Sequence, residues 1–165
     1  MTAAQAGPNW LAAIRRYLVA VTAGNLVWEM AQMPLYTLWY TGTMRDIARA
    51  ILHCTAGDLA IATVTLICAL AVVGSPDWPE RRSGAVMAAV IVGAAGYTIY
   101  SEYLNTVVRR SWAYTAWMPA LPWIGTGLTP FAQWLTVPAV ALSWAGRGVL
   151  ARAQRSPKKS SRSVT

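Results

Sequence analysis

Four stretches of the chain stay apolar for long enough to cross a lipid bilayer as helices. They cover residues 17–39, 48–73, 84–108 and 121–144. A membrane-spanning helix needs about 20 predominantly apolar residues to cross about 30 Å of hydrocarbon. The pattern therefore predicts an all-α, polytopic membrane protein, built as an antiparallel bundle of four transmembrane helices.

The composition agrees with an outer surface that faces lipid. Of the 165 residues, 56% are apolar and 12% are charged, and the charged share is about half of the roughly 25% found in globular domains. A soluble domain needs a polar surface, whereas a bilayer favours an apolar one. We expect a single membrane domain over residues 1–154, followed by a basic and disordered cytoplasmic tail over residues 155–165.

The positions of lysine and arginine predict how the chain crosses the membrane. Ten of the fourteen lie on one side of the predicted bundle: Arg15, Arg16, Arg81, Arg82, Arg147, Arg152, Arg155, Lys158, Lys159 and Arg162. The other side has Arg45, Arg49, Arg109 and Arg110. Because basic residues are in excess on cytoplasmic loops, we expect both termini in the cytoplasm and a multi-pass topology in a bacterial inner membrane.

The net charge of +8 adds a statement about partners. The sequence has no zinc finger, no aromatic RNA-binding motif and no basic helix with heptads, so nucleic acid is not an expected partner. A basic tail beside a bilayer attracts anionic lipid instead. The two cysteines, Cys54 and Cys68, lie in one apolar stretch and do not indicate a disulfide framework.

Three of the six acidic residues, Glu29, Asp58 and Glu102, lie inside the predicted spans. An ionisable side chain at the centre of a bilayer costs roughly 2.5–3.5 kcal/mol on insertion scales. Three that faced lipid would cost about 7–10 kcal/mol, which is comparable to the whole stability of a domain. We therefore expect these acids to face one another or a cavity.

Further polar residues repeat at helical spacing near these acids and in the fourth span, mostly in the outer half of the membrane. We expect them to converge in one outward-facing polar pocket, with Arg109 and Arg110 at its rim. The residues of this expected pocket are Asn25, Glu29, Gln32, His53, Asp58, Glu102, Asn105 and Gln133.

The chemistry of the pocket favours binding, or helping to transport, a cation, a metal or a small polar ligand. Carboxylates and imidazole are ligands for zinc, manganese or iron, and the candidates for a divalent metal are Glu29, His53, Asp58 and Glu102. Thioether and thiol groups suit Cu(I) instead, and they are present in Met30, Met33 and Cys54. The sequence leaves the identity of any cofactor open.

Two alternatives remain beside the binding hypothesis. In the first, the protein is a membrane-embedded enzyme that acts on a lipid or isoprenoid substrate, with the same acids catalytic and Arg109 and Arg110 holding the head group. In the second, the polar side chains form a hydrogen-bond network that fixes helix packing in a structural subunit of a membrane complex. Four helices rarely enclose a pathway alone, so transport would need a homodimer or a partner membrane subunit.

Overall fold

The computed structural model describes residues 9–122 and 125–155, which are helical apart from turns, loops and two isolated β-bridges. Within these residues there is no strand, so the all-α class is confirmed for this part of the chain. The long helices are α1 (Asn9–Gln32), α3 (Met44–Val73), α4 (Ser83–Tyr103) and α5 (Leu128–Arg155). Apart from Arg155, the predicted basic tail lies outside the described residues.

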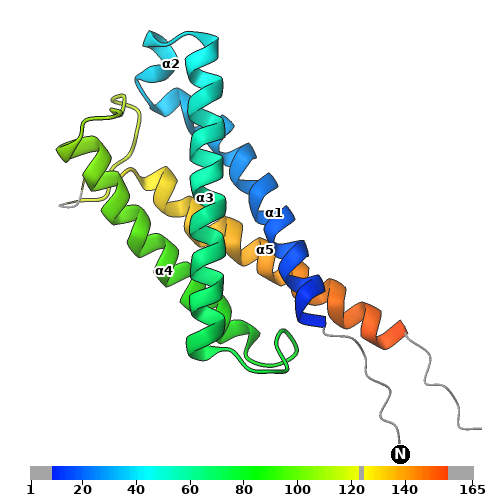
Figure 1. Ribbon diagram of the computed structural model, residues 1–165. Coiled ribbons are helices and arrows are strands. Elements are labelled where there is room, and N and C mark those ends of the chain that lie inside the picture. The colour runs from blue at the N-terminus through cyan, green and yellow to red at the C-terminus, as the bar shows by residue number, and fades with distance from the viewer. Residues whose placement is uncertain (1–8, 123–124, 156–165) are drawn as a thin grey trace, which may run out of the picture.

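The long helices pack around a common core (Figure 1). Helix α1 packs against α3 and α5, and α4 packs against the same two helices. Successive long helices run in opposite directions, so α1 begins and α5 ends at the same end of the molecule, called the terminal end below. The opposite end is called the loop end. It holds the 3-10 turn η1 (Met33–Leu35), the short helix α2 (Leu38–Thr41) and the long connection, residues 109–122 and 125–127.

Pro34 and Gly125 help to explain why two of the helices end or begin at other residues than the predicted spans. The first helix ends at Gln32 instead of reaching residue 39, because Pro34 has no N–H to continue the helix and lies in the 3-10 turn. The last helix begins at Leu128, seven residues later than predicted. Before it, the N–H of Leu121 donates to the carbonyl of Thr126 at 2.8 Å, closing a turn in which Gly125 has a φ of 74°.

The helix that begins at Ser83 changes its winding before it ends. After Tyr103 it continues as a π-helix, η2 (Leu104–Val108), in which the N–H of Arg109 donates to the carbonyl of Leu104 at 2.8 Å. A π turn holds more residues than an α turn, so later residues rotate away from the face that α spacing predicts. The stripe that contains Glu102 therefore does not continue to Asn105 and Arg109.

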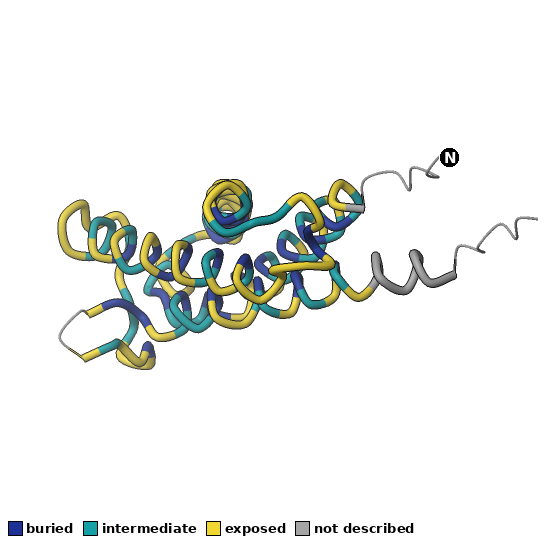
Figure 2. The backbone as a smooth tube through the Cα atoms, turned by 90° about the horizontal axis from the view of Figure 1, so that it is seen from below, coloured by how far each residue is buried: buried dark blue, intermediate teal, exposed yellow. Residues whose placement is uncertain are grey.

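Buried residues lie on the faces of the helices that turn inward, and exposed residues lie on the outward faces (Figure 2). Tyr17, Val21, Val86 and Val90 are fully buried at the terminal end. Large apolar side chains cover the outside of every long helix, and the most exposed include Val19, Val27, Leu52, Val64, Ile67, Val72, Val92 and Val140. An apolar outer surface of this kind marks contact with a membrane or with another protein.

Among the described residues, two helical segments are long and apolar enough to cross a membrane: Met44–Val73 and Ser83–Val108, in which a stretch of 18 residues has a mean hydropathy of 2.2 and 1.5, respectively. This supports membrane association at a coarse level. Four membrane spans, the orientation and the compartment remain predictions.

Candidate functional site

The side-chain amide of Gln133 in α5 lies at the centre of a buried polar cluster. Its Nε2 atom lies 2.9 Å from Asp58 Oδ2, 3.2 Å from Glu29 Oε1 and 3.3 Å from Asn25 Oδ1. Gln32 Nε2 donates to Glu29 Oε1 at 2.9 Å and lies 3.5 Å from Gln133 Oε1. We call these five residues the Gln133 cluster. It joins α1, α3 and α5, three helices that are distant in the sequence.

The Gln133 cluster is almost completely removed from the surface. Asn25 and Gln133 are at most 1% exposed, and Asp58, the most exposed member, is 9% exposed. In the part of the chain that the structure describes, neither Glu29 nor Asp58 forms an ion pair with a basic side chain. A buried carboxylate is costly unless it is paired or neutralised, so the cluster needs a positive charge.

Counting hydrogens leads to the same requirement. The Gln133 amide has two hydrogens to donate, yet oxygens of Asp58, Glu29 and Asn25 all lie within hydrogen-bonding distance of its nitrogen. The carboxyls of Glu29 and Asp58 therefore compete for one amide nitrogen. Ionised carboxylates only accept, so one acceptor of the three lacks a donor unless a carboxyl is protonated or a cation is bound.

Two further atoms of the cluster have unused hydrogen-bonding capacity. The Nδ2 atom of Asn25 and the Oε1 atom of Gln32 are both buried and have no hydrogen-bond partner. Each belongs to an amide whose other end already contacts the cluster. Buried polar atoms without partners are rare in native proteins and call for an explanation, such as a bound ion or water.

The third acid of the predicted spans, Glu102, belongs to a separate group. It is 7% exposed and accepts a hydrogen bond from the hydroxyl of Tyr114 in the long connection. That hydroxyl also accepts from the N–H of Gly127 at 3.0 Å. Burial, reinforced by the adjacent Glu102 carboxyl, raises the pKa of Tyr114 above its usual range. We call Glu102 and Tyr114 the Glu102–Tyr114 pair.

The segment after α1 and the long connection are joined to each other at the loop end. The N–H of Thr37 donates to the carbonyl of Ala113 at 2.9 Å, and the N–H of Thr115 donates to the carbonyl of Leu35 at 2.9 Å. The rings of Tyr36 and Tyr114 pack edge to face with centroids 5.4 Å apart. Tyr36 is buried, and through this ring contact it lies beside the Glu102–Tyr114 pair.

Tyr114 was not among the site residues that the sequence predicted. It lies in an irregular segment, where helical spacing assigns no face. The only available signal was the richness of that segment in aromatic residues, which does not single out one tyrosine.

Four of the predicted site residues lie outside both polar groups. His53 is exposed on α3, because five residues separate it from the buried Asp58 by about 140° around the helix. Asn105 donates to the carbonyl of Ser101 at 2.9 Å on its own helix, as its place in the π turn allows. Arg109 and Arg110 are exposed on the long connection, and Arg110 has a φ of 54°.

A metal site made of Glu29, His53, Asp58 and Glu102 is not assembled. Among the described residues, no three His, Cys, Asp or Glu side chains come together as a metal site would require. For Cu(I), Met30 is 57% exposed, whereas Met33 is buried and Cys54 is half-buried. The chemistry that the Gln133 cluster and the Glu102–Tyr114 pair offer is instead carboxyl and amide oxygen, with the phenol of Tyr114.

Comparison of the chain with models of protein families, with curated proteins and with solved structures finds no match. The Gln133 cluster and the Glu102–Tyr114 pair are therefore the observations from which a function can be proposed.

Proposed function

We propose that this protein is a four-span membrane protein whose Gln133 cluster binds one small cation, H⁺ or Na⁺. The proposed location is a bacterial inner membrane, with the start of α1 and the end of α5 on the cytoplasmic side. The two apolar helices and the apolar outer surface support the membrane part. The excess of basic residues around the terminal end supports the orientation.

The proposal of a bound cation rests on one observation. Buried carboxyls from two helices, Glu29 and Asp58, share the single neutral amide of Gln133. Two carboxyls so close together repel if both are ionised, and a bound cation removes the repulsion. The ligand atoms are oxygens of carboxyl and amide groups, which suit hard cations rather than copper or zinc. Ionisable groups within membrane helices commonly mark the paths of ions and protons.

The position of the Gln133 cluster favours access from the loop end. Glu29 lies one turn before the end of α1, and Gln133 lies in the second turn of α5. The opposite half of the core, around Val21, Leu66 and Val90, is apolar. In the proposed orientation, the cation therefore enters from outside the cytoplasm, and passage across the membrane would require a second copy or a partner subunit.

The structural alternative is favoured by the same hydrogen bonds, because they would also fix the packing of α1, α3 and α5. The binding proposal and the structural alternative predict different responses of protein stability to the concentration of the cation. A site that binds H⁺ or Na⁺ makes stability depend on the concentration of that ion, whereas a network whose carboxyls hold neither ion in the folded state does not.

The test measures thermal unfolding of the purified protein in detergent micelles, in NaCl, KCl and choline chloride from pH 5 to 9. Ligand at about 100 times its dissociation constant adds about 2.7 kcal/mol, which is a rise of about 5–10 °C for a chain of this size. We expect a rise of this order in NaCl relative to choline chloride if Na⁺ binds, or on lowering the pH if H⁺ binds.

The decisive variant is Asp58→Asn, which keeps the size of the side chain and removes its charge. It should lose the response to Na⁺ or pH, while Asp77→Asn, at an exposed position, should keep it. A wild-type protein with no response to either ion would refute the proposal. A response that is unchanged in Asp58→Asn would refute it as well, and an equal loss of stability in every buffer would establish the structural role.

A further inference from the structure

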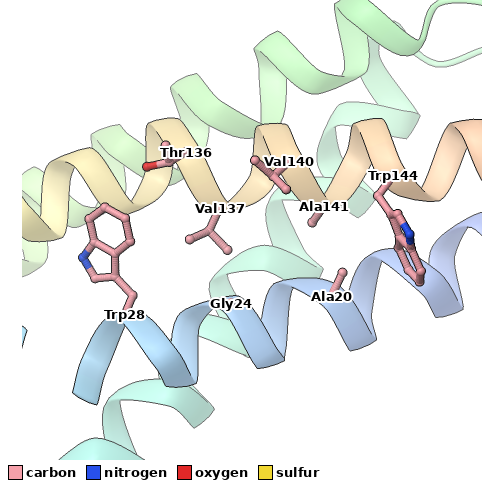
Figure 3. Close-up of a pocket in the computed structure, with 8 residues that line it drawn as sticks. All are labelled: Ala20, Gly24, Trp28, Thr136, Val137, Val140, Ala141 and Trp144. Carbon is pink, nitrogen blue, oxygen red and sulfur yellow. The ribbon is translucent and has the colours of Figure 1, made fainter. Parts of the chain in front are cut away.

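An apolar groove with a volume of about 350 Å³ runs between α1 and α5 (Figure 3). Helix α1 contributes Ala20, Gly24 and Trp28, which are four residues apart and so share one face. The two indole rings mark the ends of the groove, Trp28 at one and Trp144 of α5 at the other. None of its lining residues belongs to the Gln133 cluster or the Glu102–Tyr114 pair.

Small side chains create the groove. At its floor the two helices approach closely, because Gly24 has no side chain: a Cβ atom there would lie 2.8 Å from Val137 Cγ1. Farther along, Val140 is 67% exposed and Trp144 is 50% exposed, so the groove borders the outer surface. In a protein that spans a membrane, this surface faces the acyl chains of lipids.

The guanidinium group of Arg16, which has an unpartnered donor atom, lies at the Trp144 end of the groove. The guanidinium carbon of Arg16 lies 5.0 Å from the centroid of the Trp144 ring. This cation–π contact uses the face of the guanidinium group, and its five N–H donors lie in the plane. The Nη1 atom of Arg16 is buried and has no hydrogen-bond partner, so the site is short of one anionic acceptor.

An apolar groove that ends at an unsatisfied guanidinium matches a molecule with an acyl chain attached to a phosphate. We propose that the α1–α5 groove binds one anionic phospholipid, with an acyl chain between Trp28 and Trp144 and the phosphate at Arg16. Arginine and phosphate form strong, charge-assisted hydrogen bonds. The proposal rests on the membrane placement of the helices but not on the cation at the Gln133 cluster.

The side of the membrane agrees with this ligand. Arg16 lies in the first third of α1, toward the terminal end, which faces the cytoplasm in the proposed orientation. Anionic lipids give the cytoplasmic leaflet its negative surface potential, and each basic residue near that surface gains from it. A second copy of this chain is a less suitable occupant, because three of its six acids are buried in its own core.

The experiment uses native mass spectrometry of the delipidated full chain in detergent, with dioleoyl phosphatidylglycerol or dioleoyl phosphatidylcholine added back. We expect one retained phosphatidylglycerol per chain, with about a fivefold preference over phosphatidylcholine, as one basic contact supplies. Arg16→Gln should abolish the preference. Ala20→Leu, which fills the groove, should reduce retention of both lipids.

Matched controls lie next to each variant. Arg15→Gln removes the same charge from an exposed neighbour, and Val19→Leu enlarges an exposed side chain that does not line the groove. Both should behave as the wild type. If Arg16→Gln does not fold, Arg16→Lys keeps the charge without the forked donors and should show a weaker preference for phosphatidylglycerol.

Three results would overturn the proposal. The first is equal retention of both lipids by the wild type. The second is an equal effect of Arg15→Gln and Arg16→Gln, which would mean that only net charge matters. The third is a dimer that Ala20→Leu converts to a monomer without changing lipid retention, which would assign the groove to a second copy of the chain.

Discussion

At the loop end, α1, α3 and α5 meet through the amides and carboxyls around Gln133, whereas toward the terminal end they meet through apolar side chains such as Val21, Leu66 and Ala141. Inside a membrane, apolar packing has no hydrophobic driving force because lipid tails are equally apolar, so it contributes van der Waals contact alone. Hydrogen bonds there are directional. The polar end therefore selects how the helices align, and the apolar end sets how closely they approach.

The largest loss of stability is expected from Gln133→Leu, which disrupts the hydrogen bonds of the Gln133 cluster. The substitution removes the donor shared by Asp58, Glu29 and Asn25. Interhelical hydrogen bonds in membranes are worth about 0.6 kcal/mol on average, and acceptors left buried add to that cost. We expect a loss of about 2–3 kcal/mol, measured by unfolding in mixed detergent micelles. The control is Asn105→Leu, since the Asn105 side chain donates to Ser101 on its own helix; a loss as large as that of Gln133→Leu would contradict the role given to the cluster.

The next largest loss of stability is expected from Leu66→Ala, which weakens the apolar packing toward the terminal end. Leu66 is 2% exposed in the core. In a water-soluble core this substitution costs about 2.7–5.0 kcal/mol, of which a part is transfer from water. In a membrane protein the packing part remains, so we expect about 1–2 kcal/mol, measured by the same unfolding assay. The control, Ile67→Ala, changes an exposed neighbour and should have little effect. A cost of 4 kcal/mol or more would indicate a core that forms in water.

A smaller effect is expected from Tyr114→Phe, which tests the contact between the long connection and Glu102 of α4. The change removes the hydroxyl that donates to Glu102 and accepts from Gly127, at a cost of about 1 kcal/mol. Because the folded-state pKa of Tyr114 is raised, its contribution is complete below the unfolded pKa of about 10 and falls as the pH rises beyond it. Hydrogen exchange at Gly127 reports the change. Tyr97→Phe, at an exposed tyrosine, is the control, and equal alkaline loss in the wild type and Tyr114→Phe would contradict the assignment.

The smallest effect is expected from Thr43→Val at the start of α3, which lies at the loop end but outside the Gln133 cluster and the Glu102–Tyr114 pair. The Thr43 hydroxyl and backbone N–H contact Asp46 Oδ2, and the hydroxyl accepts from the N–H of Asp46, as in a capping box. Its loss should fray the first turn, seen as faster hydrogen exchange at residues 44–47 while the Gln133 cluster is unchanged. The control is Thr41→Val, which removes a hydroxyl that donates to the carbonyl of Thr37, outside α3. Faster exchange around Gln133 would show that the two regions are coupled.

Helical spacing was sufficient where the chain winds as an α-helix. It placed Asn25, Glu29 and Gln32 on one face, and in the structure all three lie in the Gln133 cluster. The hydrophobic pattern also anticipated the helical class. Period and length are local properties, so they can be read from the residues themselves.

The same reasoning failed where the winding changes or the chain is irregular. The π turn after Tyr103 carries Asn105 away from the stripe of Glu102, and no residue in that stretch announces a π turn. The contact between Tyr114 and Glu102 depends on how the long connection folds back over the bundle. His53 is a different case, because it lies on the regular helix α3: its offset of five positions from Asp58 turns it about 140° away from the buried face.

The place of Gln133 in the last long helix has a consequence for how the chain is made. Asp58 leaves the ribosome 75 residues before Gln133, which is about 4–15 s at ordinary rates of synthesis. During that interval the donor that later joins Glu29 and Asp58 has not been made. In a nascent chain cut short before α5, Asp58 lacks its amide donor and Glu29 keeps only that of Gln32, so the polar end of the bundle can form only after the last long helix is synthesised.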